Sequence, residues 1–183
     1  ISDIPDGAVL MSGGQVITTT DGSADVTADQ LADLTITPPA DSGDDFVLQV
    51  TADGVTQDLG VTVSVDADGA DVSASDATGT QGSEIPLTGL GAELTADTDG
   101  SETISAVVID ISDAPDGTVL STGTDNGDGT WTVDQSDLAT LSVTPPANYA
   151  GDFDVTMTVT SVDTGDTPGD TDSATDSITF NVS

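Results

Sequence analysis

The sequence predicts an all-β protein that consists of two β-sandwich modules in tandem. Three observations carry this prediction: apolar residues recur at every second position in many segments, turn-forming pairs such as Asp-Gly separate these segments, and one long pattern occurs twice. A period of two residues is typical of a strand with one buried face, and no useful length of the chain has the period of a helix. Short strands separated by frequent turns favour an antiparallel sandwich.

The repeat defines the two modules. Residues 1–10 recur as residues 111–120, and residues 26–40 match residues 133–147 with one residue of difference in a turn. Further along, Asp45-Phe46 aligns with Asp152-Phe153, and Val61, Val63 and Val65 align with Ile178, Phe180 and Val182. Self-similarity at this scale indicates two copies of one structural unit.

Alternation and turn residues place the strands in order. The first copy is predicted to contain strands over Val16–Thr18, Leu34–Ile36, Phe46–Ala52 and Leu59–Val65. The second is predicted to contain strands over Val72–Ser75, Glu84–Leu87, Thr103–Ile111, Val119–Ser121, Thr130–Val133, Leu141–Val143, Phe153–Val162 and Ser177–Val182. Asp-Gly and Asn-Gly pairs and two Pro-Pro pairs mark the turns between them. Only residues 29–32 and 135–139 suit a helical turn. Asp125, Asn126 and Asp128 suit a hairpin turn, with a contribution to cation binding as the alternative.

The domain boundaries follow from the repeat. We expect a module over residues 1–65, an acidic linker over residues 66–71 and a complete module over residues 72–183. The second copy includes a portion, residues 66–110, that has no counterpart before Ile1. Half a sandwich leaves open sheet edges. We therefore hypothesise that the missing strands of the first module lie upstream in a longer chain, removed from it or separated by an inserted domain.

The composition excludes several classes of function. The chain of 183 residues has 34 acidic residues and no Lys, Arg, His or Cys, which gives a formal net charge of -34. Binding to nucleic acid or to an anionic membrane depends on basic side chains. Ser-His nucleophiles, thiolates and Schiff bases are likewise impossible, so we do not expect an enzyme. Disulfides are absent, and we find neither a membrane-spanning segment nor a secretion signal at the N-terminus.

The acidic residues predict a calcium site at the junction of the modules. If the strand after Leu59 runs towards the linker, the antiparallel strand that starts at Phe46 begins at the same end. The carboxylates before Phe46 would then lie beside the linker. A loop with the pattern Asp-Thr-Asp-Gly-Ser-Glu adds further oxygens, and Ca²⁺ takes six to eight oxygen ligands. The predicted metal ligands are Asp44, Asp45, Asp66, Asp68, Asp71, Asp97, Asp99 and Glu102.

Two acidic segments keep an alternative explanation. The linker itself could be only a solvated acidic hinge. The loop over residues 163–172 has four aspartates and could bind calcium, but a solvated tip explains it as well.

An ordered set of motifs resembles a known family. The motifs are residues 98–103 (Thr-Asp-Gly-Ser-Glu-Thr), 115–117 (Pro-Asp-Gly), 123–132 (Gly-Thr-Asp-Asn-Gly-Asp-Gly-Thr-Trp-Thr) and 143–153 (Val-Thr-Pro-Pro-Ala-Asn-Tyr-Ala-Gly-Asp-Phe). In this order they resemble the Ig-like tandem repeats of bacterial RTX adhesins. The Asp-x-Asp of residues 97–99 also resembles the calcium-binding element of cadherins. The first copy departs from the pattern, because it has Asp-Gly-Ser-Ala over residues 21–24 and no Trp.

The resemblance implies both a function and a location. It implies an extender module of a large cell-surface or biofilm adhesin, exported by type I secretion and stiffened by Ca²⁺ between neighbouring repeats of one monomeric chain. Surface glycans or proteins would be bound through other domains. An alternative is a ligand-binding or split domain that presents a sugar- or peptide-binding module. A third interpretation is that the acidity is a halophilic adaptation of the surface, which predicts dependence on salt of any kind.

Overall fold

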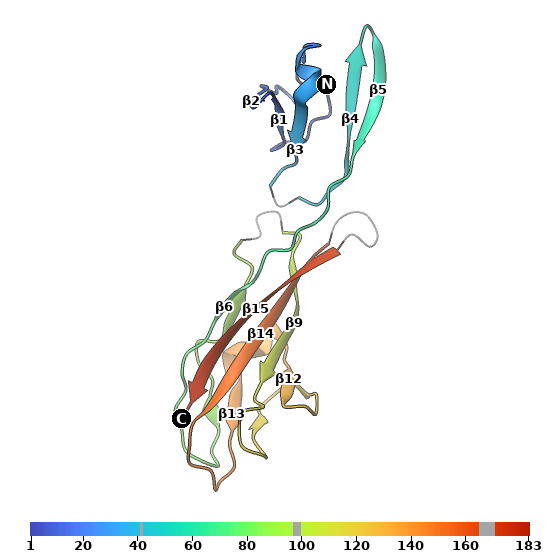
Figure 1. The fold of residues 1–183 in the computed structure, drawn as a ribbon. Coiled ribbons are helices and arrows are strands. Elements are labelled where there is room, and N and C mark those ends of the chain that lie inside the picture. Colours follow the sequence, from blue (N-terminus) through green and yellow to red (C-terminus); the bar gives the residue numbers. More distant parts are fainter. Residues whose placement is uncertain (41, 97–99, 165–170) are drawn as a thin grey trace. The chain divides into compact units, whose positions relative to one another are not determined.

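The computed structural model describes residues 1–40, 42–96, 100–164 and 171–183 (Figure 1). The chain forms several antiparallel sheets and, in the described residues, two short 3-10 helices, so the predicted all-β class is confirmed. None of the described helices is long and apolar enough to cross a membrane. The chain divides into two compact units: unit 1 contains Ile1–Asp66 and Thr164–Asp172, and unit 2 contains Ala67–Asp163 and Ser173–Ser183.

Unit 1 contains a small sheet and a hairpin. Strands β1 (Val9–Ser12), β2 (Gln15–Val16) and β3 (Leu34–Thr37) form a sheet in the order β2-β1-β3, and β4 (Phe46–Ala52) pairs with β5 (Val55–Val61). Its core consists of Ile4, Leu10, Ile17, Ala24 and Leu48. Phe46 pairs with Val61, so β4 begins where β5 ends, as the sequence predicted.

Two strand predictions in unit 1 need correction. The last strand runs from Val55 to Val61 and does not continue to Val65, because its partner β4 begins at Phe46, which pairs with Val61. Asp53 and Gly54 both have positive φ (51° and 78°), and this conformation closes a two-residue hairpin that matches the twist of its strands. Strand β1 was not predicted, because Met11 and Ser12 break the simple alternation.

Unit 2 contains three sheets. One has the order β10-β13-β7 (Val119–Leu120, Ser142–Thr144, Ile85–Pro86), and the largest has the order β11-β12-β9-β14-β15 (Thr124–Asp125, Thr130–Thr132, Thr103–Asp110, Phe153–Thr164, Thr171–Val182). The third pairs β6 (Asp71–Ser73) with β8 (Gly91–Glu93). Ala77 also forms a parallel bridge with Val182. The core includes Ile109, Leu141, Val143, Val155 and Met157, all at most 1% exposed.

The two copies of the repeat have the same strand register. In unit 1, β1 pairs with β3 through Val9 with Thr37 and Leu10 with Ile36. In unit 2, β10 pairs with β13 through Val119 with Thr144 and Leu120 with Val143, which are the residues that the repeat aligns with those of unit 1. The predicted helical turns are also present, as η1 (Gln30–Asp33) and η2 (Gln135–Thr140).

Candidate functional site

The predicted ligands in unit 1 do not gather into a site within that unit. Asp44 and Asp66 are exposed, and Asp45 is half-buried. The Asp45 carboxylate accepts a hydrogen bond from the backbone N–H of Val63 at 2.9 Å. Asp45 therefore has a local structural role, in which it holds the segment that follows β5 against the start of β4.

In unit 2, two of the predicted residues come together. The backbone N–H of Asp68 donates a hydrogen bond to Oε1 of Glu102 at 3.2 Å. Asp71 is exposed, and its carboxylate accepts a hydrogen bond from the Thr95 hydroxyl. Asp97 and Asp99 lie outside the described residues. Within the described part of the chain, no group of three or more acidic side chains is arranged to hold a metal ion.

The most unusual feature of unit 2 is a pair of buried carboxylates on neighbouring strands. Glu102 is 5% exposed and Asp163 is 2% exposed. Strands β9 and β14 are antiparallel, and Val162 pairs with Thr103, so Asp163 is the next residue opposite Glu102. Burial alternates along both strands, and Glu102 and Asp163 both fall on the buried face. Opposite residues on one face have Cβ atoms roughly 5 Å apart.

One oxygen of the Asp163 side chain lacks a hydrogen-bond partner in the part of the chain that the structure describes. This atom, Oδ1, is buried. Buried polar atoms nearly always have a partner, and a buried charge without one costs several kcal/mol. Because the chain has no Lys, Arg or His, no basic side chain can neutralise Glu102 and Asp163.

Other oxygen atoms of unit 2 lie close to this pair. The Ser161 hydroxyl, which is fully buried, donates to the backbone carbonyl of Asp68 at 2.6 Å. A Cβ atom on Gly69 would lie only 2.1 Å from Oδ2 of Asp176, so the Asp176 carboxylate lies against the backbone of Gly69. The segment at residues 68–69 is thus in contact with Glu102, Ser161 and Asp176. These contacts bring carboxylate, hydroxyl and carbonyl oxygens to one end of unit 2, and such oxygens are the ligands of a hard cation such as Ca²⁺.

Sequence reasoning identified Glu102 but did not select Asp163. The strand was predicted to end at Val162, and Asp163 was assigned to a loop. The signal was present in the sequence, because the positions 155, 157, 159 and 161 are all buried and Asp163 continues the same alternation. A carboxylate at an inward position of a long strand is the pattern that should have marked this residue.

The acidic hairpin of unit 2 has the predicted turn structure. Asp125 accepts a hydrogen bond from the N–H of Gly127, and Oδ1 of Asp128 accepts bonds from both the hydroxyl and the N–H of Thr130. The Thr130 hydroxyl, followed by its N–H, lowers the pKa of Asp128 below its ordinary value. These carboxylates are therefore occupied by the turn.

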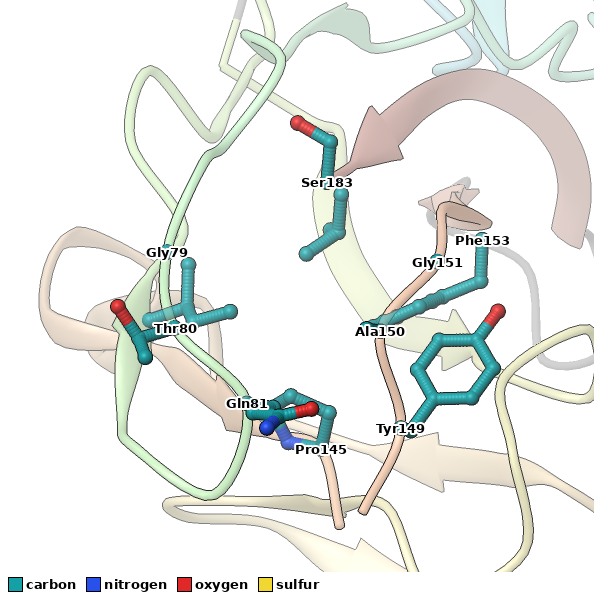
Figure 2. A pocket seen from close by; sticks show the side chains of 11 residues that line it. Gly79, Thr80, Gln81, Pro145, Tyr149, Ala150, Gly151, Phe153 and Ser183 are labelled. Atoms are coloured by element: carbon teal, nitrogen blue, oxygen red, sulfur yellow. The ribbon is translucent and has the colours of Figure 1, made fainter. Parts of the chain in front are cut away.

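A pocket of about 380 Å³ lies elsewhere in unit 2 (Figure 2). It is lined by residues that include Gln81, Pro145, Tyr149 and Phe153. The rings of Tyr149 and Phe153 are 6.4 Å apart, and the Tyr149 hydroxyl donates to the carbonyl of Asp152. The aromatic groups of this pocket are thus used for packing and for a local turn.

Comparison with known proteins gives no relative from which a function can be transferred. No family model matches the chain, and no match is found among curated proteins or among solved structures. A proposal about function must therefore rest on the residues themselves.

Proposed function

We propose that this chain is an extender segment of a secreted bacterial surface adhesin, formed by tandem Ig-like β-sandwich modules, and that Ca²⁺ stabilises it through the carboxylates around Glu102 and Asp163. The observation that carries the calcium proposal is the buried pair in a chain without any basic residue. The resemblance of the repeat to RTX adhesin modules supports the adhesin assignment.

The chemistry of the buried pair supports a divalent cation. Two negative charges at the roughly 5 Å that separates the Cβ atoms of opposite residues repel each other by about 3 kcal/mol at an effective dielectric constant of 20. A bound Ca²⁺ replaces this repulsion by attraction to both carboxylates. Glu102 and Asp163 would be its charged ligands, and the Asp68 carbonyl would be a neutral one. The predictions for Asp97, Asp99 and the ligands in unit 1 remain predictions.

Cation binding would contribute directly to the stability of unit 2. An ion that binds only the folded state stabilises it by about 2.7 kcal/mol when its concentration is 100 times the dissociation constant. Glu102 precedes β9 and Asp163 lies near the end of β14. The ion would therefore link β9 and β14, which are neighbours in the largest sheet, at one end. This is how Ca²⁺ would stiffen an extender module.

Thermal unfolding tests the proposal. The chain is heated in millimolar Ca²⁺, in Mg²⁺ and in chelator, all at equal ionic strength, and unfolding is followed by the fluorescence of Trp131, the only Trp, which packs against the core of unit 2. We expect a higher midpoint in Ca²⁺ than in Mg²⁺ or chelator. An equal midpoint in all three, together with a rise in plain sodium chloride, would instead support halophilic adaptation.

A further inference from the structure

Among the described residues, strand β3 of unit 1 is an edge strand, whereas its counterpart in unit 2 is a central one. In unit 2, β13 lies between β10 and β7, whereas in unit 1 the described sheet has the order β2-β1-β3 (Figure 1). The register of β1 with β3 is the same as that of β10 with β13, so the partner that β3 lacks is the counterpart of β7.

Burial differs between the two copies as the missing strand predicts. Leu141 and Val143 of β13 are 1% and 0% exposed, whereas the aligned Leu34 and Ile36 of β3 are only half-buried. Six of the seven large apolar side chains that are exposed in the described residues belong to unit 1, among them Val16, Val55 and Leu59, although unit 1 is the smaller unit. In the described residues, unit 1 therefore exposes more large apolar side chains than unit 2, and its β3 is less buried than β13.

The backbone of β3 also directs N–H and C=O groups towards the edge that points away from β1. In unit 2, the N–H of Leu87 donates to the carbonyl of Leu141 at 2.9 Å, and the carbonyl of Ser142 accepts from Ser121 on the opposite edge. Backbone groups alternate between the two edges of a strand. Because the register is shared, the N–H and C=O of Ile36 and the C=O of Leu34 face the edge of β3 that points away from β1. An edge with unpaired N–H and C=O groups is a template for another strand.

Strand β7 shows which strand such an edge accepts. Ile85 and Leu87 are 3% and 2% exposed and cover β13. Glu84, which precedes them, and Pro86, which lies between them, are exposed. Pro86 has no N–H and leaves the outer edge of β7 without a donor there, so pairing ends with this strand. The fitting strand thus has two large apolar residues two positions apart.

A second copy of the chain is a poor source of that strand. Each copy carries a formal charge of -34, and like charges on this scale oppose self-association. We propose that unit 1 binds an extended polypeptide strand of the Ile-x-Leu type, supplied from outside residues 1–183, antiparallel along the free edge of β3. This inference does not depend on calcium.

Peptide titration of the whole chain, labelled with ¹⁵N, tests the inference. The probe is a synthetic peptide with the sequence of residues 82–89 (Gly-Ser-Glu-Ile-Pro-Leu-Thr-Gly), and the matched control peptide carries Ile85→Ser and Leu87→Ser. We expect the probe to slow hydrogen exchange of the Ile36 amide at least about tenfold, as pairing does for other strand amides. The Val143 amide serves as the internal control, because its edge is already paired.

Protection of Ile36 by the probe and not by the control peptide supports the inference. It is overturned if Ile36 is already as protected as Val143 without peptide, if millimolar probe leaves Ile36 unchanged, or if both peptides act equally. Sedimentation velocity over a range of protein concentrations completes the test, because concentration-dependent dimers that protect Ile36 would identify a second copy as the occupant and also overturn the inference.

Discussion

Replacing Asp163 by Asn should have opposite effects with and without calcium. The substitution keeps the shape of the side chain and removes one of two buried charges. Without a cation, two charges at the Cβ separation of opposite residues, roughly 5 Å, repel each other by about 3 kcal/mol, so Asp163→Asn should stabilise unit 2 by up to that amount. With calcium bound, the same substitution removes a charged ligand and should destabilise it.

Thermal unfolding followed by Trp131 fluorescence measures both effects in one experiment. About 3 kcal/mol corresponds to a shift of roughly 10 °C in the midpoint of a domain of this size. We expect Asp163→Asn to raise the midpoint in chelator and to lower it in Ca²⁺ relative to the unsubstituted chain. Asp113→Asn, which removes an exposed charge from the same unit, is the matched control and should change neither midpoint appreciably.

One result would refute this reasoning. If Asp163→Asn lowered the midpoint equally in chelator and in Ca²⁺, the carboxylate would be a structural acceptor and neither a source of repulsion nor a calcium ligand. Glu102→Gln provides an independent check, since it should show the same reversal of sign.

Three further predictions concern packing, pH and backbone conformation. Leu141→Ala should destabilise unit 2 by about 2–5 kcal/mol in chemical denaturation, whereas Leu34→Ala at the aligned position of unit 1 should cost less, because Leu34 is only half-buried. The pKa of Asp128 is lowered in the folded state, so the stability that its bonds to Thr130 contribute is present above the ordinary pKa of an Asp and is lost as the pH falls through the lowered value; the protection factor of the Thr130 amide, which is corrected for the intrinsic pH dependence of exchange and followed by NMR during acidification, should show this loss, and a protection factor indifferent to pH would contradict it. Gly129→Ala should cost more than Gly127→Ala in thermal unfolding, since both have positive φ but only at Gly129 would a Cβ atom lie 2.8 Å from Ser112; equal losses would argue against this close contact.

Local patterns predicted most of the strands, and pairing between distant residues accounts for what was missed. The alternation over residues 46–52 gave β4 with its correct bounds. For β5 the predicted bounds were too late in the chain, and Leu59, which the alternation placed on the buried face, is exposed. The observed bounds follow from the hairpin that the positive φ of Asp53 and Gly54 closes. The register of each sheet was not predicted, because it depends on pairing between residues that are far apart in the sequence.

The candidate site was likewise predicted only where the signal is local in the sequence. Glu102 was predicted because it follows Asp and Gly in a motif that suits calcium. Asp163 stands opposite Glu102 only because β9 and β14 pair, and residues far apart in the sequence give no local sign of such a neighbour. The burial that makes Asp163 unusual is a property of the folded sheet, which the sequence hinted at only through alternation.

The parallel bridge of Ala77 with Val182 has a mechanical consequence. Ala77 and Gly79 donate hydrogen bonds to Asn181 and Ser183, and Ser183 donates to Ala77. Because these segments run in the same direction, tension applied at opposite ends of unit 2 slides one along the other and strains all three bonds together. An antiparallel hairpin pulled at its two ends would instead open one bond after another. We therefore expect these hydrogen bonds to be loaded in shear and to resist stretching of unit 2 along the chain.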